Sequence, residues 1–216
     1  MTLEPQREVQ NNSHLETHSN WESWGGAEKT QELQEKKEVL SKIVGRPILY
    51  WSGHVANWAY VLSTLGIAVF LSRPHELFLG ACLFAFGFWV WGLLEYVFHR
   101  WAYHKNASFM AVGHLMHHDE PEALIGMPWV INLTILVGIF LAASWLIGTQ
   151  TAGFILAGIW MGHISYTLVH HGIHNWNLNS AWFRKLKAHH KIHHKLPDKN
   201  LGVTTIYWDR LFRTRV

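Results

Sequence analysis

Short runs of histidine carry the chemistry that this sequence could perform. The chain contains 17 histidines, and most of them occur in runs that follow apolar stretches. Helical residues three or four positions apart lie on the same face, so each run can direct its imidazoles toward one place. Neutral imidazole binds iron, zinc, copper and nickel. The candidate metal ligands are His99, His104, His114, His117, His118, His170, His174, His190, His193 and His194.

The number and spacing of these imidazoles indicate two metal ions. Ten nitrogens exceed what one ion accepts, and the lack of clustered carboxylates argues against magnesium and calcium. His99 and His104 are five residues apart, about 140° round an α-helix, so they converge best if the helix ends or bends between them. His189 lies four residues before His193 and could replace His190. The single cysteine, Cys82, excludes a thiolate zinc site or an iron–sulfur cluster.

Four apolar stretches must position these histidines. Each is near the ~20 helical residues that cross the hydrocarbon of a bilayer, which predicts an all-α integral membrane protein with four transmembrane helices. Very short connectors pair the stretches into two hairpins, so both turns share one side and the histidines lie on the other. Packing as buried helices of a soluble protein would leave little polar surface to cover them. The predicted spans are about 55–71, 77–98, 129–147 and 152–169.

The charge distribution orients this bundle. Residues 1–53 carry 6 basic and 8 acidic side chains, whereas residues 172–216 carry 9 basic and 2 acidic ones. Basic segments beside membrane spans stay in the cytosol, which places both termini and the histidines on that side. Lipid headgroups are the expected anionic neighbour, and no nucleic-acid recognition motif accompanies the charge. A bacterial inner membrane and the endoplasmic reticulum fit equally well.

The remaining organisation follows from composition. A polar N-terminal stretch without an apolar period predicts disorder, and a weakly amphipathic stretch after it predicts a lead-in helix on the surface. Gly158 and Gly162 are four residues apart, a spacing typical of close helix packing. The predicted divisions are a tail over 1–26, a lead-in helix over 27–53 and a membrane domain over 54–216, with a metal-binding cap from 99–128 and 170–216.

Together, the histidine runs resemble the membrane fatty acid hydroxylase and sterol desaturase superfamily. Glu95 and Tyr96 before the first run, and residues 201–212 after the last, are most similar to the sphingolipid fatty acid 2-hydroxylase branch. The resemblance covers about residues 77–216. Its pattern is His99-x4-His104, His114-x2-His117-His118, His170-x3-His174 and His190-x2-His193-His194.

This resemblance implies a diiron centre that uses O2 to hydroxylate an aliphatic carbon of a lipid. It implies the same ten ligands and is the sole reason to prefer His190 to His189. Zinc could occupy the site in isolated protein. The paired haem histidines of a cytochrome b5 module are not found, so a separate electron-transfer protein is the expected partner.

Contacts behind the ligands and competing functions complete the expectations. Glu95, one turn before His99, is expected to accept a hydrogen bond from a ligand ring, and His171 is a second candidate for such support. A lipid or sterol desaturase would use the same metals and oxidant. A carotenoid hydroxylase has a similar pattern, but an Asp is expected there at the position of His171. A membrane metal-binding protein is the non-enzyme alternative, although its histidines would be expected along the spans.

Overall fold

The computed structural model describes residues 26–44, 46–104 and 108–216, and all regular structure within them is helical, as predicted. The tail predicted over residues 1–26 lies outside these ranges apart from its last residue. The helices are α1 (Gly26–Val44), α2 (Pro47–Phe70), the short η2 (Pro74–Glu76), α3 (Leu77–Val97), η3 (Phe98–Tyr103), α4 (Phe109–Asp119), α5 (Trp129–Ile147), α6 (Thr149–Asn175), α7 (Ala181–Lys195) and α8 (Tyr207–Leu211).

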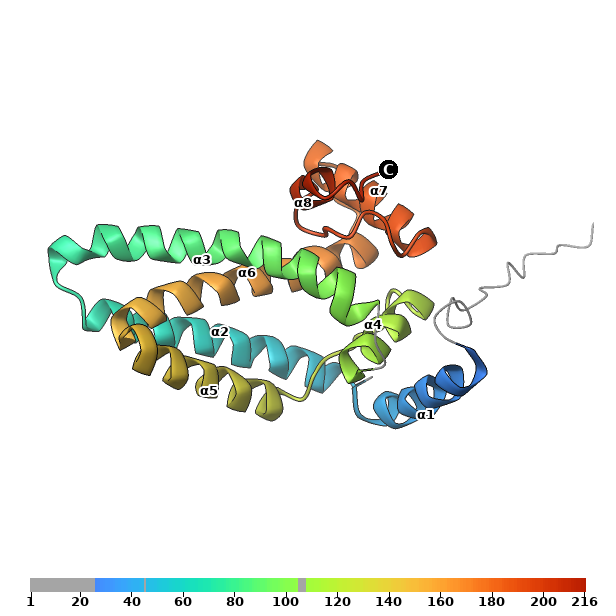
Figure 1. Cartoon of the computed structure of the whole chain (residues 1–216), viewed down its shortest axis with the longest axis horizontal. Coiled ribbons are helices and arrows are strands. Elements are labelled where there is room, and N and C mark those ends of the chain that lie inside the picture. Colours follow the sequence, from blue (N-terminus) through green and yellow to red (C-terminus); the bar gives the residue numbers. More distant parts are fainter. Residues whose placement is uncertain (1–25, 45, 105–107) are drawn as a thin grey trace, which may run out of the picture.

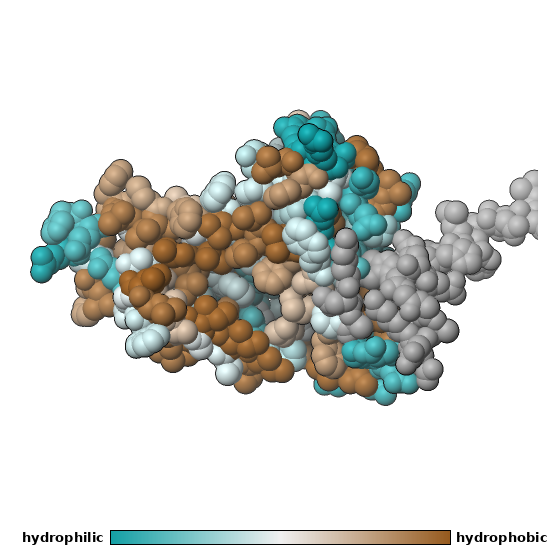
Figure 2. Space-filling view, viewed as in Figure 1, coloured by the Kyte–Doolittle hydropathy of each residue, from teal (hydrophilic) through white to brown (hydrophobic). Residues whose placement is uncertain are grey.

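Four helical segments are long and apolar enough to cross a membrane. Their outward faces carry large apolar side chains, with Phe70 86% and Trp145 85% exposed. Figure 2 shows this apolar surface along the bundle. Such surface is costly in water but matches lipid, so the chain is a multi-pass membrane protein. The four segments are Pro47–Phe70, Pro74–Tyr103, Trp129–Ile147 and Thr149–Asn175.

The bundle is organised around α6, which packs against α2, α3 and α5. In Figure 1 the four long helices run side by side, with both short connections at one end and α4, α7 and α8 at the other. The α5–α6 turn consists of Gly148 alone, whose φ of 84° lies in the left-handed region that glycine adopts readily. The two hairpins therefore place their turns together, as the short connectors predicted.

Two helix boundaries differ from the predictions. The first membrane helix begins at Pro47 rather than near residue 55, so residues 47–53 belong to α2 and not to the lead-in helix. Proline at the first helical position is well suited to start a helix, but Ser52, Gly53 and His54 dilute the hydropathy there. At the same end of the bundle, α6 continues to Asn175, beyond the predicted end at 169. Hydropathy marks the apolar part of a helix and not its full length.

The lead-in helix α1 packs against α4, which carries three of the candidate ligands. Leu33 is 1% exposed and lies in a cluster with Val112 and Leu115 of α4. The Lys37 ammonium lies 2.6 Å from the Asp119 carboxylate at the end of α4. This helix therefore covers a ligand-bearing element as well as lying on the protein surface.

Glycines bring the backbones of α3 and α6 into close contact. A Cβ added at Gly87 of α3 would lie 2.2 Å from the carbonyl oxygen of Ile155, and one at Gly158 of α6 would lie 2.0 Å from that of Phe84. A Cβ at Gly162 would lie 2.5 Å from the side chain facing it on α3. The close packing predicted for Gly158 and Gly162 is therefore confirmed.

We expect Gly158→Ala to destabilise the bundle, because its methyl group would overlap a backbone carbonyl that cannot move without separating α3 from α6. Overpacking of this kind costs about 1–3 kcal/mol, and backbone contact places the change at the upper end. Thermal unfolding in detergent measures the effect. Gly138→Ala on α5 is the matched control, since a Cβ there meets nothing within 4 Å. Equal melting temperatures of the two variants would contradict this close contact between the backbones of α3 and α6.

Candidate metal centre

Ten histidine side chains meet in two groups of five at the end of the bundle opposite the short turns. Within each group, one ring nitrogen of every residue lies within 4.8 Å of the others. All ten are the histidines that the sequence predicted, and the chain brings them together from η3, α4, α6 and α7 and from the residue after η3. Group A consists of His99, His104, His114, His118 and His193, and group B of His117, His170, His174, His190 and His194.

The spacing in group A fits a shared ion. The Nε2 atom of His114 lies 3.0 Å from that of His99, 3.1 Å from that of His104 and 3.0 Å from that of His118. The Nε2 atom of His193 lies 3.2 Å from that of His104 and 3.1 Å from that of His118. A neutral imidazole has one N–H, so these atoms cannot all donate to each other. Two nitrogens held at right angles on an ion by bonds of ~2.1 Å would be ~3.0 Å apart.

Group B has the same spacing. The Nε2 atom of His190 lies 3.0 Å from that of His170, 3.1 Å from that of His174 and 3.0 Å from that of His194. The Nε2 atom of His117 is buried without a hydrogen-bond partner among the residues that the structure describes, and its ring centroid is 4.3 Å from that of His170. An unpartnered buried acceptor among four other imidazoles also fits an ion ligand. The donor set of both groups therefore suits two transition metals.

A π-helix brings His99 and His104 into the same group. The sequence predicted that the helix ends or bends between them, and the structure has a π-helix over Phe98–Tyr103 that ends just before His104. In a π-helix the backbone bonds run from i to i+5, so residues five apart come onto one side. The two rings stack with centroids 5.1 Å apart. The local change of period thus allows a five-residue spacing to serve one site.

The two H-x-x-H-H runs are each divided between the groups, whereas their histidines were predicted to point at one place. On α4, His114 and His118 enter group A and His117 enters group B. On α7 the pair four residues apart, which includes His190, enters group B, and His193 enters group A. Consecutive helical residues diverge by about 100°, so the middle histidine is directed to the neighbouring group. Both helices therefore hold both groups.

Backbone carbonyls after α7 fix two of the ligand rings. The Nδ1–H of His99 donates to the Leu201 carbonyl, and that of His193 donates to the Lys199 carbonyl at 2.9 Å. With the proton on Nδ1, the lone pair is on Nε2, which faces the other imidazoles of group A. Hydrogen bonds of this kind set the tautomer and the orientation of metal-binding histidines.

Glu95 supports the same loop and not a ligand ring. Its carboxylate accepts from the backbone N–H of Val203 at 2.6 Å, from that of Thr204 at 3.0 Å and from the Thr204 hydroxyl. Within the described residues, none of its hydrogen bonds comes from a histidine. The prediction that Glu95 accepts a hydrogen bond from a ligand ring is therefore wrong. Glu95 is 3% exposed, and its bonds tie α3 to the loop whose Leu201 carbonyl orients His99.

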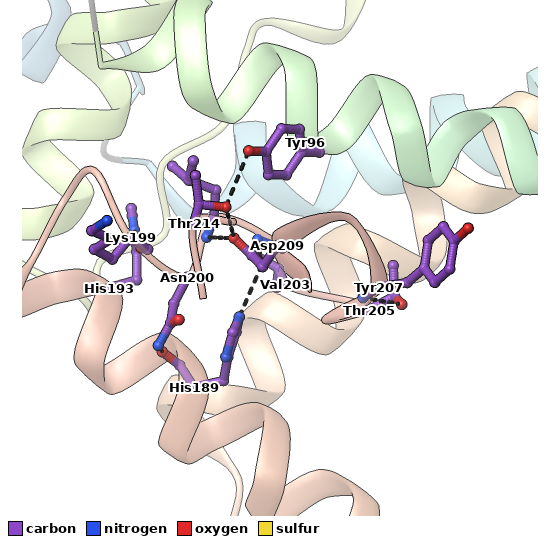
Figure 3. Close-up of polar contacts among 12 residues, drawn as sticks. Tyr96, His189, His193, Lys199, Asn200, Val203, Thr205, Tyr207, Asp209 and Thr214 are labelled. Carbon is purple, nitrogen blue, oxygen red and sulfur yellow. Dashed lines mark hydrogen bonds and ion pairs between the residues drawn. The ribbon is translucent and has the colours of Figure 1, made fainter. Parts of the chain in front are cut away.

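Asp209 is a buried support whose role was not predicted, although it lies within the stretch 201–212 that carries the family resemblance. Its carboxylate accepts from the backbone N–H groups of Leu201 and Gly202, both at 2.8 Å, and from the Thr214 hydroxyl at 2.7 Å. It also accepts from Nε2 of His189 at 3.0 Å (Figure 3). Burial raises its pKa, but these hydrogen bonds outweigh burial and lower it. His189 therefore faces Asp209, while His190 enters group B.

His171 lies beside the site and not behind a ligand. Its ring faces Tyr50 and Trp176, with centroids 5.8 Å away in both cases, and Nδ1 lies 3.4 Å from the Asn175 amide nitrogen. Because it follows His170 directly, the helix turns it about 100° away from group B. The structure gives it no hydrogen bond to the ten histidines within the described residues, and its expected supporting role is not found.

Burial keeps the cap histidines neutral. Desolvation, with a contribution from His194, lowers the pKa of His104 to about 4, and desolvation lowers that of His194 to about 4. Desolvation, followed by the charge of His104, lowers the pKa of His193 to about 3. Neutral imidazoles with free lone pairs at pH 7 are the form that binds a metal.

Comparison with known proteins identifies the family of this site. Residues 84–214, which include all ten histidines, match the model of the fatty acid hydroxylase family. This chain belongs to the fatty acid hydroxylase family. The matched region runs from α3 to the C-terminal segment that carries Asp209 and Thr214, so the supporting hydrogen bonds lie within it as well.

Several relatives in this family act on sphingolipids by their names. The chain is 32% identical to the dihydroceramide fatty acyl 2-hydroxylase FAH2 of Arabidopsis thaliana over 60% of this chain and 59% of that protein. It is 30% identical to the ceramide very long chain fatty acid hydroxylase SCS7 of Saccharomyces cerevisiae over 76% of this chain and 45% of that protein. The chain thus spans about half the length of these relatives.

A solved structure shares the fold. It is described as full-length scs7p with only the hydroxylase domain visible, and it matches with a TM-score of 0.66 and 27% identity. The match covers 77% of this chain and 66% of that one. The all-helical arrangement of the membrane domain is therefore that of a solved member of the family.

We expect the fully loaded protein to bind two metal ions per chain and each group to lose its ion separately. His193→Ala removes a group A ligand and His117→Ala a group B ligand, so each variant should retain about one ion. His189→Ala is the matched control because its ring faces Asp209, and it should retain two. Metal analysis of purified protein by mass spectrometry gives the count. One ion or none in wild-type protein would contradict the two-group arrangement.

We also expect the metal-free protein to lose stability as the pH falls from about 7 toward about 4. Unfolded histidine titrates near 6.5, whereas His104 and His194 titrate near 4 in the fold. Between these values the unfolded chain binds more protons, so protonation favours unfolding. Thermal melts of chelator-treated protein at pH 7 and pH 5 measure the change. A higher melting temperature at pH 5 would show that these rings are not held neutral.

Proposed function

We propose that this chain hydroxylates an aliphatic carbon of a fatty acyl lipid, with O2 as oxidant and two iron ions held by groups A and B. The observation that carries this proposal is the pair of five-histidine groups at one end of a lipid-facing bundle. Imidazole nitrogens suit iron, and the relatives of the chain are named as fatty acid and ceramide hydroxylases.

When bound, the two ions would supply the activation of O2 that oxidation of an unactivated C–H bond requires. The side chains of the protein keep the site dry and its ring nitrogens oriented for metal binding. His190 and His193 are 0% exposed, so bulk water is kept from the ring nitrogens. The hydrogen bonds from His99 and His193 to backbone carbonyls keep the lone pairs on Nε2. The loop held by Glu95 and Asp209 keeps those carbonyls in place.

The substrate follows from the location of the site. Groups A and B lie where η3 and α6 reach the membrane surface, so the acyl chain of a lipid can extend among the apolar spans while its head stays near the surface. In α6, His163 lies seven residues before His170, and its ring centroid is 4.8 Å from that of Trp91. Its buried Nδ1 has no hydrogen-bond partner among the described residues. These contacts support a polar position beside the proposed site of the acyl chain.

The same proposal includes an orientation and a partner. Nine basic side chains in residues 172–216 favour a cytosolic location of the metal groups and of both termini. Hydroxylation with O2 consumes two electrons, which a reductant must deliver to the metal groups. A separate electron-transfer protein on the cytosolic side is therefore part of the proposed function.

We expect membranes that contain the iron-loaded protein, a reductant and its electron-transfer partner to incorporate 18O from 18O2 into a hydroxylated lipid. His118→Ala should abolish the label, because His118 is a group A ligand. His75→Ala in η2, at the end of the bundle opposite the histidine groups, is the control and should label normally. Lipid mass spectrometry reads out the product. Label from water would indicate a hydrolytic enzyme, and a new double bond without label would indicate a desaturase.

A further inference from the structure

The C-terminal helix α8 packs onto α3 inside the membrane-spanning segment. The rings of Trp208 and Trp89 have centroids 5.6 Å apart, and those of Phe212 and Tyr96 stack at 5.0 Å. Between these contacts, a Cβ at Gly92 would lie 3.2 Å from Nε1 of Trp208. Positions 89, 92 and 96 lie on one face of a helix. One side of α8 therefore covers a continuous strip of α3.

This strip of α3 lies within the helix, at some distance from its C-terminal end. The 21 residues of α3 rise ~32 Å at 1.5 Å per residue, about the thickness of the hydrocarbon layer. Trp89 precedes Val97, the last residue of α3, by eight residues, which corresponds to ~12 Å along the helix. Trp89 is 55% exposed and Phe88 44%, so this part of α3 also faces the surroundings of the bundle. Helix α8 therefore lies beside a lipid-facing surface.

The outward side of α8 combines apolar and basic residues. Tyr207 is 54% exposed and Leu211 is 56% exposed. Arg210 of α8 and Arg213, two residues after its end, are also exposed. Asp209, the acidic residue of α8, is 0% exposed. Figure 3 shows Tyr207 pointing away from the polar cluster around Asp209. Apolar side chains next to cations, without exposed acid, are typical of helices that lie in a membrane interface.

We propose that α8 is an interfacial membrane anchor that binds anionic phospholipid in the leaflet on the histidine side. Tyr207 and Leu211 enter the upper acyl region, and Arg210 and Arg213 pair with lipid phosphates. Lipid is favoured over a protein partner because the surface of α8 is continuous with the exposed side chains of α3. A soluble protein that covered α8 would have to displace lipid from this part of α3.

The anchor has a direct connection to group A. The segment that ends in α8 contains Leu201, whose carbonyl accepts the hydrogen bond of His99, and Val203 and Thr204, which bind Glu95. Asp209 of α8 itself holds the backbone of Leu201. Contact between α8 and the leaflet therefore positions the loop that orients a ligand ring.

Spin labels on the full-length chain in lipid nanodiscs test the location of α8. In a Cys82→Ala background, Leu211→Cys and Tyr207→Cys carry the label on α8, and Asp198→Cys carries it on an exposed turn of the cap. We expect the α8 labels to be several-fold more accessible to O2, which concentrates in lipid, than to a water-soluble nickel chelate. The Asp198 label should show the reverse. An α8 label with the profile of the Asp198 label would overturn the proposal.

The charged part of the anchor is tested by lipid selectivity. Nanodiscs of zwitterionic phospholipid receive a small fraction of spin-labelled anionic phospholipid, and its association with the protein is measured. Arg210→Gln removes one interfacial arginine and should lower this association roughly fivefold. Lys185→Gln, which removes an equal charge on α7, is the control and should have a smaller effect.

Three other outcomes would also overturn the proposal. Equal effects of Arg210→Gln and Lys185→Gln would mean that α8 has no specific role in binding lipid. Protection of the Leu211 label only after addition of an acidic redox protein would assign α8 to a protein partner. Spin–spin coupling between Leu211 labels of different chains would assign it to a second copy.

Discussion

The burial of ten imidazoles with their ring nitrogens turned toward one another is the constraint on which the other features depend. Desolvating these nitrogens without partners costs free energy, and imidazoles that share a few N–H groups cannot satisfy each other. In the proposed function a shared cation in each group offsets this cost. The π-helix around His99, the divided histidine runs on α4 and α7 and the length of α6 all bring ring nitrogens to the required distance.

Support for the site comes largely from one short segment. Leu201 orients His99 through its carbonyl, Asp209 binds the N–H groups of Leu201 and Gly202, and Glu95 binds those of the next two residues. Two buried carboxylates thus act on the site through a loop without touching the ligand nitrogens. This arrangement leaves all ten candidate ligands as neutral imidazoles, so the charge of bound ions would not be compensated within the groups.

Residue types, helical spacing and connector lengths predicted nine of the ten histidines, the hairpins and the close glycine contacts, because these depend on the local sequence, whereas the family resemblance alone favoured His190 over His189. The π-helix after Val97 was not predictable, since nothing in the composition of residues 98–103 distinguishes it from an ordinary helical turn. The roles of Glu95 and Asp209 were missed because both carboxylates bind backbone groups. The backbone partner of Glu95 at Val203 is 108 residues away, and that of Asp209 at Leu201 is 8 residues away. Backbone N–H groups occur at almost every position, so a sequence cannot single out which ones a carboxylate will bind.

The crossing of α3 and α6 at their glycines has a geometric consequence for the spacing of the two groups. His99 follows Gly87 by twelve residues, and His170 follows Gly158 by twelve. Each helix therefore extends ~18 Å from the crossing to a histidine, which belongs to group A on α3–η3 and to group B on α6. A change of about 5° in the crossing angle would move one of these histidines by ~1.6 Å relative to the other, close to the length of a metal–nitrogen bond. Because helix tilt responds to bilayer thickness, a change in the thickness of the membrane that altered this crossing angle would alter the separation of groups A and B.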